Sequence, residues 1–133
     1  MATVKRFEDL EVWKKSRVLS KDIFEIITTG KLATDYRLRD QMNGSSGSIM
    51  DNIAEGFERG SKLEFINFLS FSKGSAGELR SQLYRALDRQ YITQEKFDEL
   101  FNKAEEISKM NGGLIDYLNK SLLKGNKFKD RVK

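Results

Sequence analysis

Apolar residues recur every three or four positions along most of this 133-residue chain. This spacing places them on one side of an α-helix. Four such stretches predict amphipathic helices over about residues 7–27, 37–58, 62–88 and 94–122. The chain contains no proline, which would otherwise interrupt a helix. The pattern therefore predicts an all-α protein.

Two of these helices have clear start signals. Ser61 is followed by Glu64, which together form a capping box, and Thr93 stands directly before the fourth helix. The connections between the helices are short, and short connections favour antiparallel neighbours. We therefore expect an antiparallel, up-down-up-down four-helix bundle made of residues 1–123. Asn111 falls on the apolar stripe of the last helix, where a buried amide would fix the register of the helices.

The second and third helices each carry a further stripe of small residues, away from the apolar one. Gly44, Gly47 and Ala54 form it on the second helix, and Gly74, Gly77 and Ser81 form it on the third. A helical glycine costs about 1 kcal/mol relative to alanine but allows another backbone to come close. One four-helix core cannot use both faces of both helices. We expect tight packing of the second helix on the third, together with a contact to a neighbouring subunit.

The net charge of +4 comes entirely from the end of the chain. The whole sequence has 24 Lys plus Arg and 20 Asp plus Glu, and residues 124–133 hold five of the former and one of the latter, so residues 1–123 are neutral. We expect 124–133 to be a disordered basic tail. Such a tail can bind RNA or a membrane, or it can be a solubilising end.

Basic residues elsewhere are candidates for nucleic-acid contacts as well, although mixed-charge helix faces are commonly only solvated ion-pair surfaces. The candidates are Lys14, Arg17 and Lys21 on the first helix, Arg80, Arg85 and Arg89 on the third, and Lys124, Lys127, Lys129 and Arg131 in the tail.

The composition argues against an enzyme. The chain has no cysteine and no histidine, which removes thiolate chemistry, the commonest metal ligand and the commonest general base. The glycine-rich stretches follow no strand, as a phosphate-binding loop would require, and Ser72 and Lys73 are adjacent, so a helix points them apart. We expect no catalytic residue, no metal, no cofactor and no small-molecule substrate.

No apolar run approaches the roughly 18 residues that span a membrane, and the charged beginning is unlike a secretory signal. We therefore expect a cytoplasmic protein with no membrane partner.

A polar group stands on the second helix around the sequence "NIAEG". Asn52 lies at the edge of the apolar stripe, and Glu55 precedes Arg59 by one turn, which suits an ion pair. We expect Asn52, Glu55 and Arg59 to form a structural polar network between helices. The alternative is a ligand or metal site that draws on Glu55 and its acidic neighbours.

Several spaced motifs resemble one known family. Phe7, Leu10 and Val12-Trp13, then "NIAEG" at 52–56 and "GSAGEL" at 74–79 are similar to the four-helix bundle proteins encoded by intervening sequences of the 23S ribosomal RNA gene. The resemblance covers about residues 5–120. It implies a bacterial, cytoplasmic homopentameric barrel. It also implies kinship with accessory proteins of diversity-generating retroelements, which bind a reverse transcriptase and nucleic acid.

The chain departs from that family at one place. Family members often carry arginines where this chain has Met42, Asn43 and Gly44. The resemblance therefore implies a module that binds itself, and RNA or a nucleic-acid enzyme, but it leaves a protein-interaction scaffold as the alternative.

Overall fold

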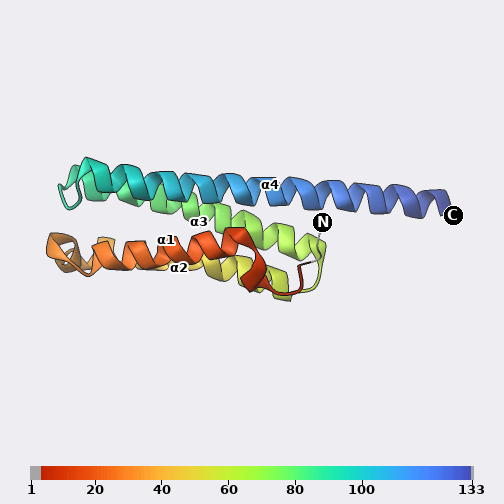
Figure 1. The fold of residues 1–133 in the computed structure, drawn as a ribbon, viewed down its shortest axis with the longest axis horizontal. Coiled ribbons are helices and arrows are strands. Elements are labelled where there is room, and N and C mark those ends of the chain that lie inside the picture. The colour runs from red at the N-terminus through yellow and green to blue at the C-terminus, as the bar shows by residue number, and fades with distance from the viewer. Residues whose placement is uncertain (1–3, 133) are drawn as a thin grey trace.

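Four α-helices and two short 3-10 helices make up the protein. A computed structural model describes the backbone of residues 4–132 and the side chains of residues 4–123. The elements are η1 (Phe7–Asp9), α1 (Glu11–Ile27), η2 (Gly30–Thr34), α2 (Tyr36–Glu58), α3 (Lys62–Asp88) and α4 (Gln94–Val132). In Figure 1 the α1–α2 and α3–α4 connections lie at one end of the molecule, and the α2–α3 connection lies at the other. The described residues contain no strand, as the sequence predicts.

The first helix begins later than its apolar pattern suggests. Leu10 has an extended backbone, with φ −73° and ψ 126°, so η1 and α1 are separate. The break turns Phe7 back onto Trp13, and their ring centroids are 5.2 Å apart in an edge-to-face contact. The aromatic contact therefore packs η1 against the beginning of α1.

Side-chain caps define three helix starts. The Ser61 hydroxyl accepts a hydrogen bond from the Glu64 N–H at 3.4 Å, and the Thr93 hydroxyl accepts one from Lys96 at 3.1 Å. Asp35 caps α2 by accepting from the Leu38 N–H at 3.3 Å. These bonds satisfy backbone donors that the first turn of a helix leaves free.

One hydrophobic core runs along the bundle. α2 packs against α3, α3 against α4, and α1 against both α2 and α4. Its fully buried large side chains come from all four helices and from η2; they are Leu19, Ile23, Leu32, Leu38, Met42, Ile49, Ile53, Leu69, Leu79, Leu83, Leu100 and Ile107. The predicted apolar stripes therefore supply the residues of the buried core.

A buried polar chain crosses this core. Asn111 is fully buried and donates from Nδ2 to the Ser72 hydroxyl at 3.0 Å, and that hydroxyl donates to the Ile49 carbonyl at 2.7 Å. The chain joins α4, α3 and α2 at one level. Asn111 Oδ1 is buried without a partner in the described part of the chain, so the amide depends on its Nδ2 bond. Because losing that bond as well would be costly, this level fixes the register of three helices.

α2 packs tightly on α3 at Gly56, which the small-residue stripes do not include. A Cβ atom at Gly56 would lie 2.5 Å from the Phe68 Cβ, which is too close for any real contact. A Cβ at Gly44, Gly47 or Gly74 would meet nothing within 4 Å. The predicted tight packing of the two helices is thus made by Gly56, and the predicted glycine stripes lie outside it.

The last helix continues past the rest of the bundle. α4 has 39 residues, against 27 in α3, and its end projects beyond the α2–α3 connection (Figure 1). Its backbone remains helical to Val132, where the sequence predicts a disordered tail. The absence of proline permits this continuation. The side chains of Lys124, Lys127, Lys129 and Arg131 lie outside the described residues.

Replacing Gly56 tests the packing of α2 on α3. We expect Gly56→Ala to lower the free energy of unfolding by about 1–3 kcal/mol, because the added methyl group overpacks the contact with Phe68. Gly113→Ala is the matched control: Gly113 is exposed on α4, with nothing within 4 Å of an added Cβ. It should raise that free energy by about 0.5–1 kcal/mol. Urea unfolding of both variants measures the difference, and equal effects would contradict this packing.

Candidate interaction surfaces

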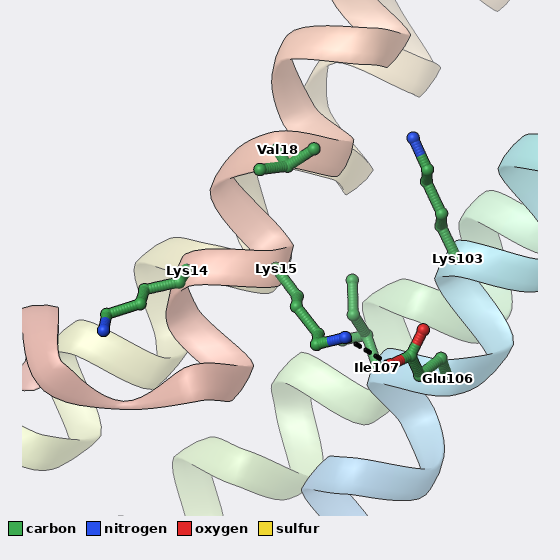
Figure 2. A pocket seen from close by; sticks show the side chains of 6 residues that line it. All are labelled: Lys14, Lys15, Val18, Lys103, Glu106 and Ile107. Atoms are coloured by element: carbon green, nitrogen blue, oxygen red, sulfur yellow. Dashed lines mark hydrogen bonds and ion pairs between the residues drawn. The ribbon is translucent and has the colours of Figure 1, made fainter.

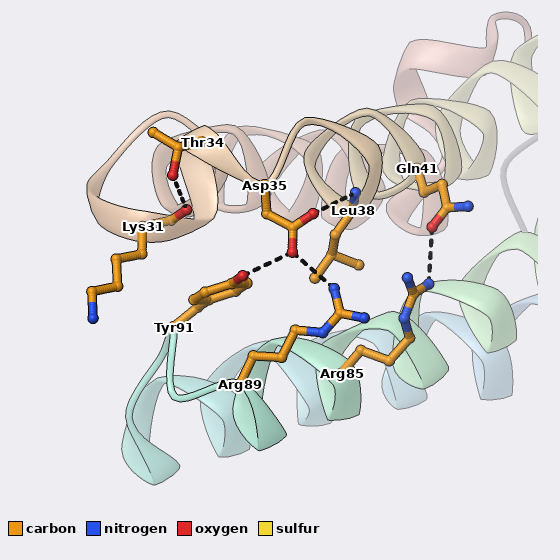
Figure 3. Close-up of polar contacts among 8 residues, drawn as sticks. All are labelled: Lys31, Thr34, Asp35, Leu38, Gln41, Arg85, Arg89 and Tyr91. Atoms are coloured by element: carbon orange, nitrogen blue, oxygen red, sulfur yellow. Dashed lines mark hydrogen bonds and ion pairs between the residues drawn. The ribbon is translucent and has the colours of Figure 1, made fainter.

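Two of the α3 arginines bind α2 of their own chain. The Arg85 guanidinium donates to the Gln41 amide oxygen at 2.9 Å, and Arg89 donates to the Asp35 carboxylate at 2.8 Å (Figure 3). Both were candidates for nucleic-acid contacts. The structure shows each of them joined to the beginning of α2 in the same subunit, and their contact with nucleic acid stays a prediction.

The third α3 arginine lies between α3 and α4. Arg80 Nη1 is 4.0 Å from the Glu105 carboxylate, and its guanidinium stands 5.9 Å from the centre of the Phe101 ring. Its Nε atom is buried and has no partner within the described part of the chain. Arg80 therefore faces the α3–α4 contact.

Asp35 is the centre of a polar cluster at the end where α1 meets α2 and α3 meets α4 (Figure 3). Its Oδ2 atom accepts from the Tyr91 hydroxyl and from Arg89, each at 2.8 Å, while Oδ1 caps α2. The hydrogen bond from Tyr91 is the largest cause that lowers the pKa of Asp35, and the bonds from Leu38 and Arg89 act in the same direction. The same bond to Asp35 raises the pKa of the Tyr91 hydroxyl.

A left-handed turn brings Tyr91 to this cluster. Gln90 has φ +59°, and its N–H donates to the Leu87 carbonyl while the Tyr91 N–H donates to Ala86, both at 2.9 Å. This is the usual way for a helix to end, but glycine normally holds the left-handed position. Because Gln90 is not a glycine, the sequence contains no signal for this turn. The apolar spacing likewise did not indicate a role for Tyr91.

The α1 cations do come together on one outward face. Lys14, Arg17 and Lys21 line a shallow hollow of about 370 Å³ with Trp13 and Val18. Lys14 is 3.4 Å from Glu11, whereas Arg17 and Lys21 form no ion pair among the described side chains. This face is basic and partly apolar.

A second hollow lies between α1 and α4. It measures about 250 Å³ and is lined by Lys14, Lys15, Val18, Lys103, Glu106 and Ile107 (Figure 2). Lys15 pairs with Glu106, and Lys103 donates to Asp22 at 2.6 Å, which is the largest cause that raises the pKa of Lys103. The two lysines therefore close the seam between α1 and α4 with ion pairs, and their charge is neutralised there.

The outward face of α2 is hollowed where its glycines lack side chains. The hollow, about 510 Å³, is lined by Ser20, Asn43, Gly44, Gly47, Ser48, Asp51, Asn52 and Glu55. Asn52 donates to the Ser48 carbonyl at 2.8 Å and to its hydroxyl at 2.9 Å. The Ser75 hydroxyl of α3 donates to the same Ser48 oxygen at 3.1 Å. Asn52 thus belongs to a polar link between α2 and α3.

Glu55 and Arg59 form a separate group. Their side chains are 2.9 Å apart, and the Arg59 guanidinium also stands 5.0 Å from the centre of the Phe68 ring. Within residues 4–123, no three acidic side chains are grouped as metal ligands would be. The sequence predicts one network here, and the structure has two neighbouring ones.

The outward stripe of α3 is uncharged. Ser70, Gly74 and Ser81 are exposed on it, and at its ends Leu63 is 69% exposed and Tyr84 50%. Gly77 is only partly covered, with Arg80 3.5 Å from the position of its absent Cβ. Leu63 and Tyr84 stand at opposite ends of the stripe, and the Tyr84 ring packs 4.9 Å from the Phe97 ring of α4, so the two do not form one apolar patch.

The chain has clear similarity to known proteins. The family model of the 23S rRNA-intervening sequence protein matches residues 8–113. The chain belongs to this family. Its fold is similar to the crystal structure of a protein of unknown function from the S23 ribosomal protein family of Bacteroides thetaiotaomicron. The two share 26% sequence identity and a TM-score of 0.72 over 78% of this chain and 97% of the other.

A search among curated proteins finds no match. In the described part of this intervening-sequence family member, none of the helices has the length and apolar character needed to cross a bilayer.

Replacing Asp35 by asparagine tests the polar cluster through its pH dependence. Because the folded-state pKa of Asp35 is lowered, its charge contributes stability above its ordinary pKa of 3.8, and this contribution is lost as the pH falls through the lower folded value. Asparagine can still cap α2. We expect Asp35→Asn to be less stable than the parent in urea at pH 7 and pH 5.

The difference between the two proteins should shrink as the pH falls below about 4. Asp116→Asn, an exposed change on α4, is the control and should behave like the parent at every pH. A stability difference for Asp35→Asn that stays constant from pH 7 to pH 2 would show that the carboxylate charge has no part in the cluster.

Proposed function

We propose that this protein is a non-enzymatic, homo-oligomeric helical module of the 23S rRNA intervening-sequence type. Its antiparallel, up-down-up-down subunit assembles as a homopentameric barrel in the cytoplasm. Its further partner is RNA or an enzyme that acts on nucleic acid. The proposal requires no cofactor, no metal and no small-molecule substrate.

The position of the helical glycines is the observation that supports the proposed assembly. Gly44, Gly47 and Gly74 lie in helices, yet a Cβ atom at any of them would have nothing within 4 Å in the subunit. Each lowers helix stability by about 1 kcal/mol relative to alanine with no packing gain inside the chain. A close contact with another subunit supplies a reason for that cost.

The basic end of the chain supports the nucleic-acid part of the proposal. Residues 124–133 carry the whole net charge, and the α4 backbone extends beyond the bundle as far as Val132 (Figure 1). Arg85 and Arg89 each donate to a side chain of their own chain and Arg80 faces Glu105, so the tail is the proposed main contact with phosphate. Repetition of the tail around a ring would multiply a weak attraction.

A protein-interaction scaffold without nucleic acid is the second candidate. The stripe on α3 formed by Ser70, Gly74 and Ser81 favours it, because a surface without charged residues does not attract phosphate.

Filling one glycine tests the assembly. We expect the parent protein to have a mass several times that of its 15.3 kDa chain in light scattering. Gly47→Leu should reduce that mass, because overpacking a tight contact costs roughly 1–3 kcal/mol. The subunit itself should not be weakened, since leucine is the better helix former.

Gly113→Leu is the matched control, because Gly113 is also exposed on a helix with free space around it. It should leave the mass unchanged. A parent mass near that of one chain at micromolar concentrations would refute the assembly, and an unchanged mass for Gly47→Leu would remove the α2 face from it.

Deleting residues 124–133 tests the proposed partner. The deletion removes four net positive charges per chain, or about twenty in a five-subunit ring. We expect the affinity for a structured RNA at about 50 mM salt to fall by tenfold or more, with a weaker dependence on salt, because fewer counterions are released. The mass of the assembly should stay the same.

Filter binding of the parent and truncated proteins at two salt concentrations provides the measurement. Equal affinity and equal salt dependence would identify the tail as a solubilising end. If neither protein binds RNA, the scaffold function stands in its place.

A further inference from the structure

Two outward faces of the subunit carry opposite charge. Lys14, Arg17 and Lys21 lie on the α1 face, where Arg17 and Lys21 have no ion-pair partner in the described chain. The α2 face carries Asp51, Glu55 and Glu58, all exposed. Among the side chains of residues 4–123, only Glu55 of these three has an ion-pair partner, which is Arg59. The faces contain opposing charges as well: Glu11 pairs with Lys14, and Glu25 is exposed on α1. The balance remains basic on α1 and acidic on α2.

The opposite charges stand at matching heights along the bundle. Ser20 of α1 lines a hollow with Gly47 and its neighbours, and Phe24 lines one with Asp40 and Asn43. The two helices are therefore antiparallel: in one direction along the bundle, residue numbers increase in α1 and decrease in α2. With the same rise per residue in both helices, Arg17 is level with about residue 50, next to Asp51. Lys14 is level with about residue 53, between Asp51 and Glu55.

Side-chain size matches along the same two faces. Phe24 is 57% exposed on α1, and its level on α2, about residue 43, adjoins Gly44. Lys21 is level with about residue 46, which adjoins Gly47. The long side chains of the α1 face therefore lie at the same heights as the glycines of the α2 face, which line the α2 hollow.

We propose that the basic face of α1 in one subunit docks on the glycine-lined acidic face of α2 in the next copy of the chain. The proposal rests on the ring assembly proposed above and names the surfaces that meet in it. A rotation about an axis along the bundle keeps every residue at its own height. Arg17 and Lys14 of one copy therefore meet Asp51 and Glu55 of the next, and Phe24 and Lys21 enter the space over Gly44 and Gly47.

The contact joins two different faces, so it passes from subunit to subunit and forms a ring when the rotation between neighbouring copies closes. Close charge pairs of this kind fix the register and the orientation of the partners. The α1 cations are then engaged with protein, and nucleic acid does not reach them.

A charge swap tests the contact in the full-length protein. Arg17→Glu and Asp51→Arg should each raise the dissociation constant of the assembly by about tenfold or more, measured by light scattering over a dilution series. The double variant, which carries both changes, should recover to within about threefold of the parent. Lys109→Glu makes the same change of charge as Arg17→Glu at an exposed position on α4 and should have no effect.

A cross-linking measurement checks the same contact without any substitution. A zero-length carbodiimide reagent should join Lys14 or Lys21 to Asp51 or Glu55. In a mixture of isotopically light and heavy protein, these links should appear with mixed masses, since they connect two chains. Links of unmixed mass alone would overturn the proposal.

The outcomes separate this inference from the proposed function. A parent protein that stays monomeric overturns both. An assembled parent whose charge variants assemble equally well, with unchanged circular-dichroism melts, overturns only the contact between α1 and α2. If Arg17→Glu keeps the mass but loses RNA binding, the α1 face is a nucleic-acid surface and the contact is overturned.

Discussion

The pairing of α2 with α3 is the constraint on which the rest of the structure depends. At one end the Phe68 side chain of α3 packs directly on Gly56, where a Cβ atom would lie 2.5 Å from the Phe68 Cβ. Along the middle, the Ser72 and Ser75 hydroxyls bind groups of α2, and at the other end Arg85 and Arg89 do so. The whole length of the pair is thereby fixed, and α1 packs against its α2 member while α4 packs against its α3 member.

The core was predictable because it depends on local spacing. Residues such as Ile49 and Leu79 recur at helical intervals, and burial follows from that spacing alone. The same holds for Asn111, whose place on the apolar stripe indicated a buried amide, and for the caps at Ser61 and Thr93. Each of these features is set by residues within a few turns of one another.

The polar contacts between distant segments were not predictable in the same way. Asp35 and Tyr91 are 56 positions apart, and their hydrogen bond depends on a left-handed turn at Gln90 that no glycine marks. The α3 arginines illustrate the same limit, because a periodic pattern shows which side of a helix a cation occupies but not which carboxylate lies opposite. Gly56 was indistinguishable from the other glycines until the position of Phe68 was known.

The unequal helix lengths give the molecule a direction. Because α4 extends past one end of the bundle only, in any closed ring whose axis follows the helices every extension emerges on the same side. Such a ring has two unlike rims. One carries the basic chain ends, and the other carries the connections that Asp35 holds together. A large anionic body would therefore approach the ring from a single direction, and two rings would not stack through their basic rims without a polyanion between them.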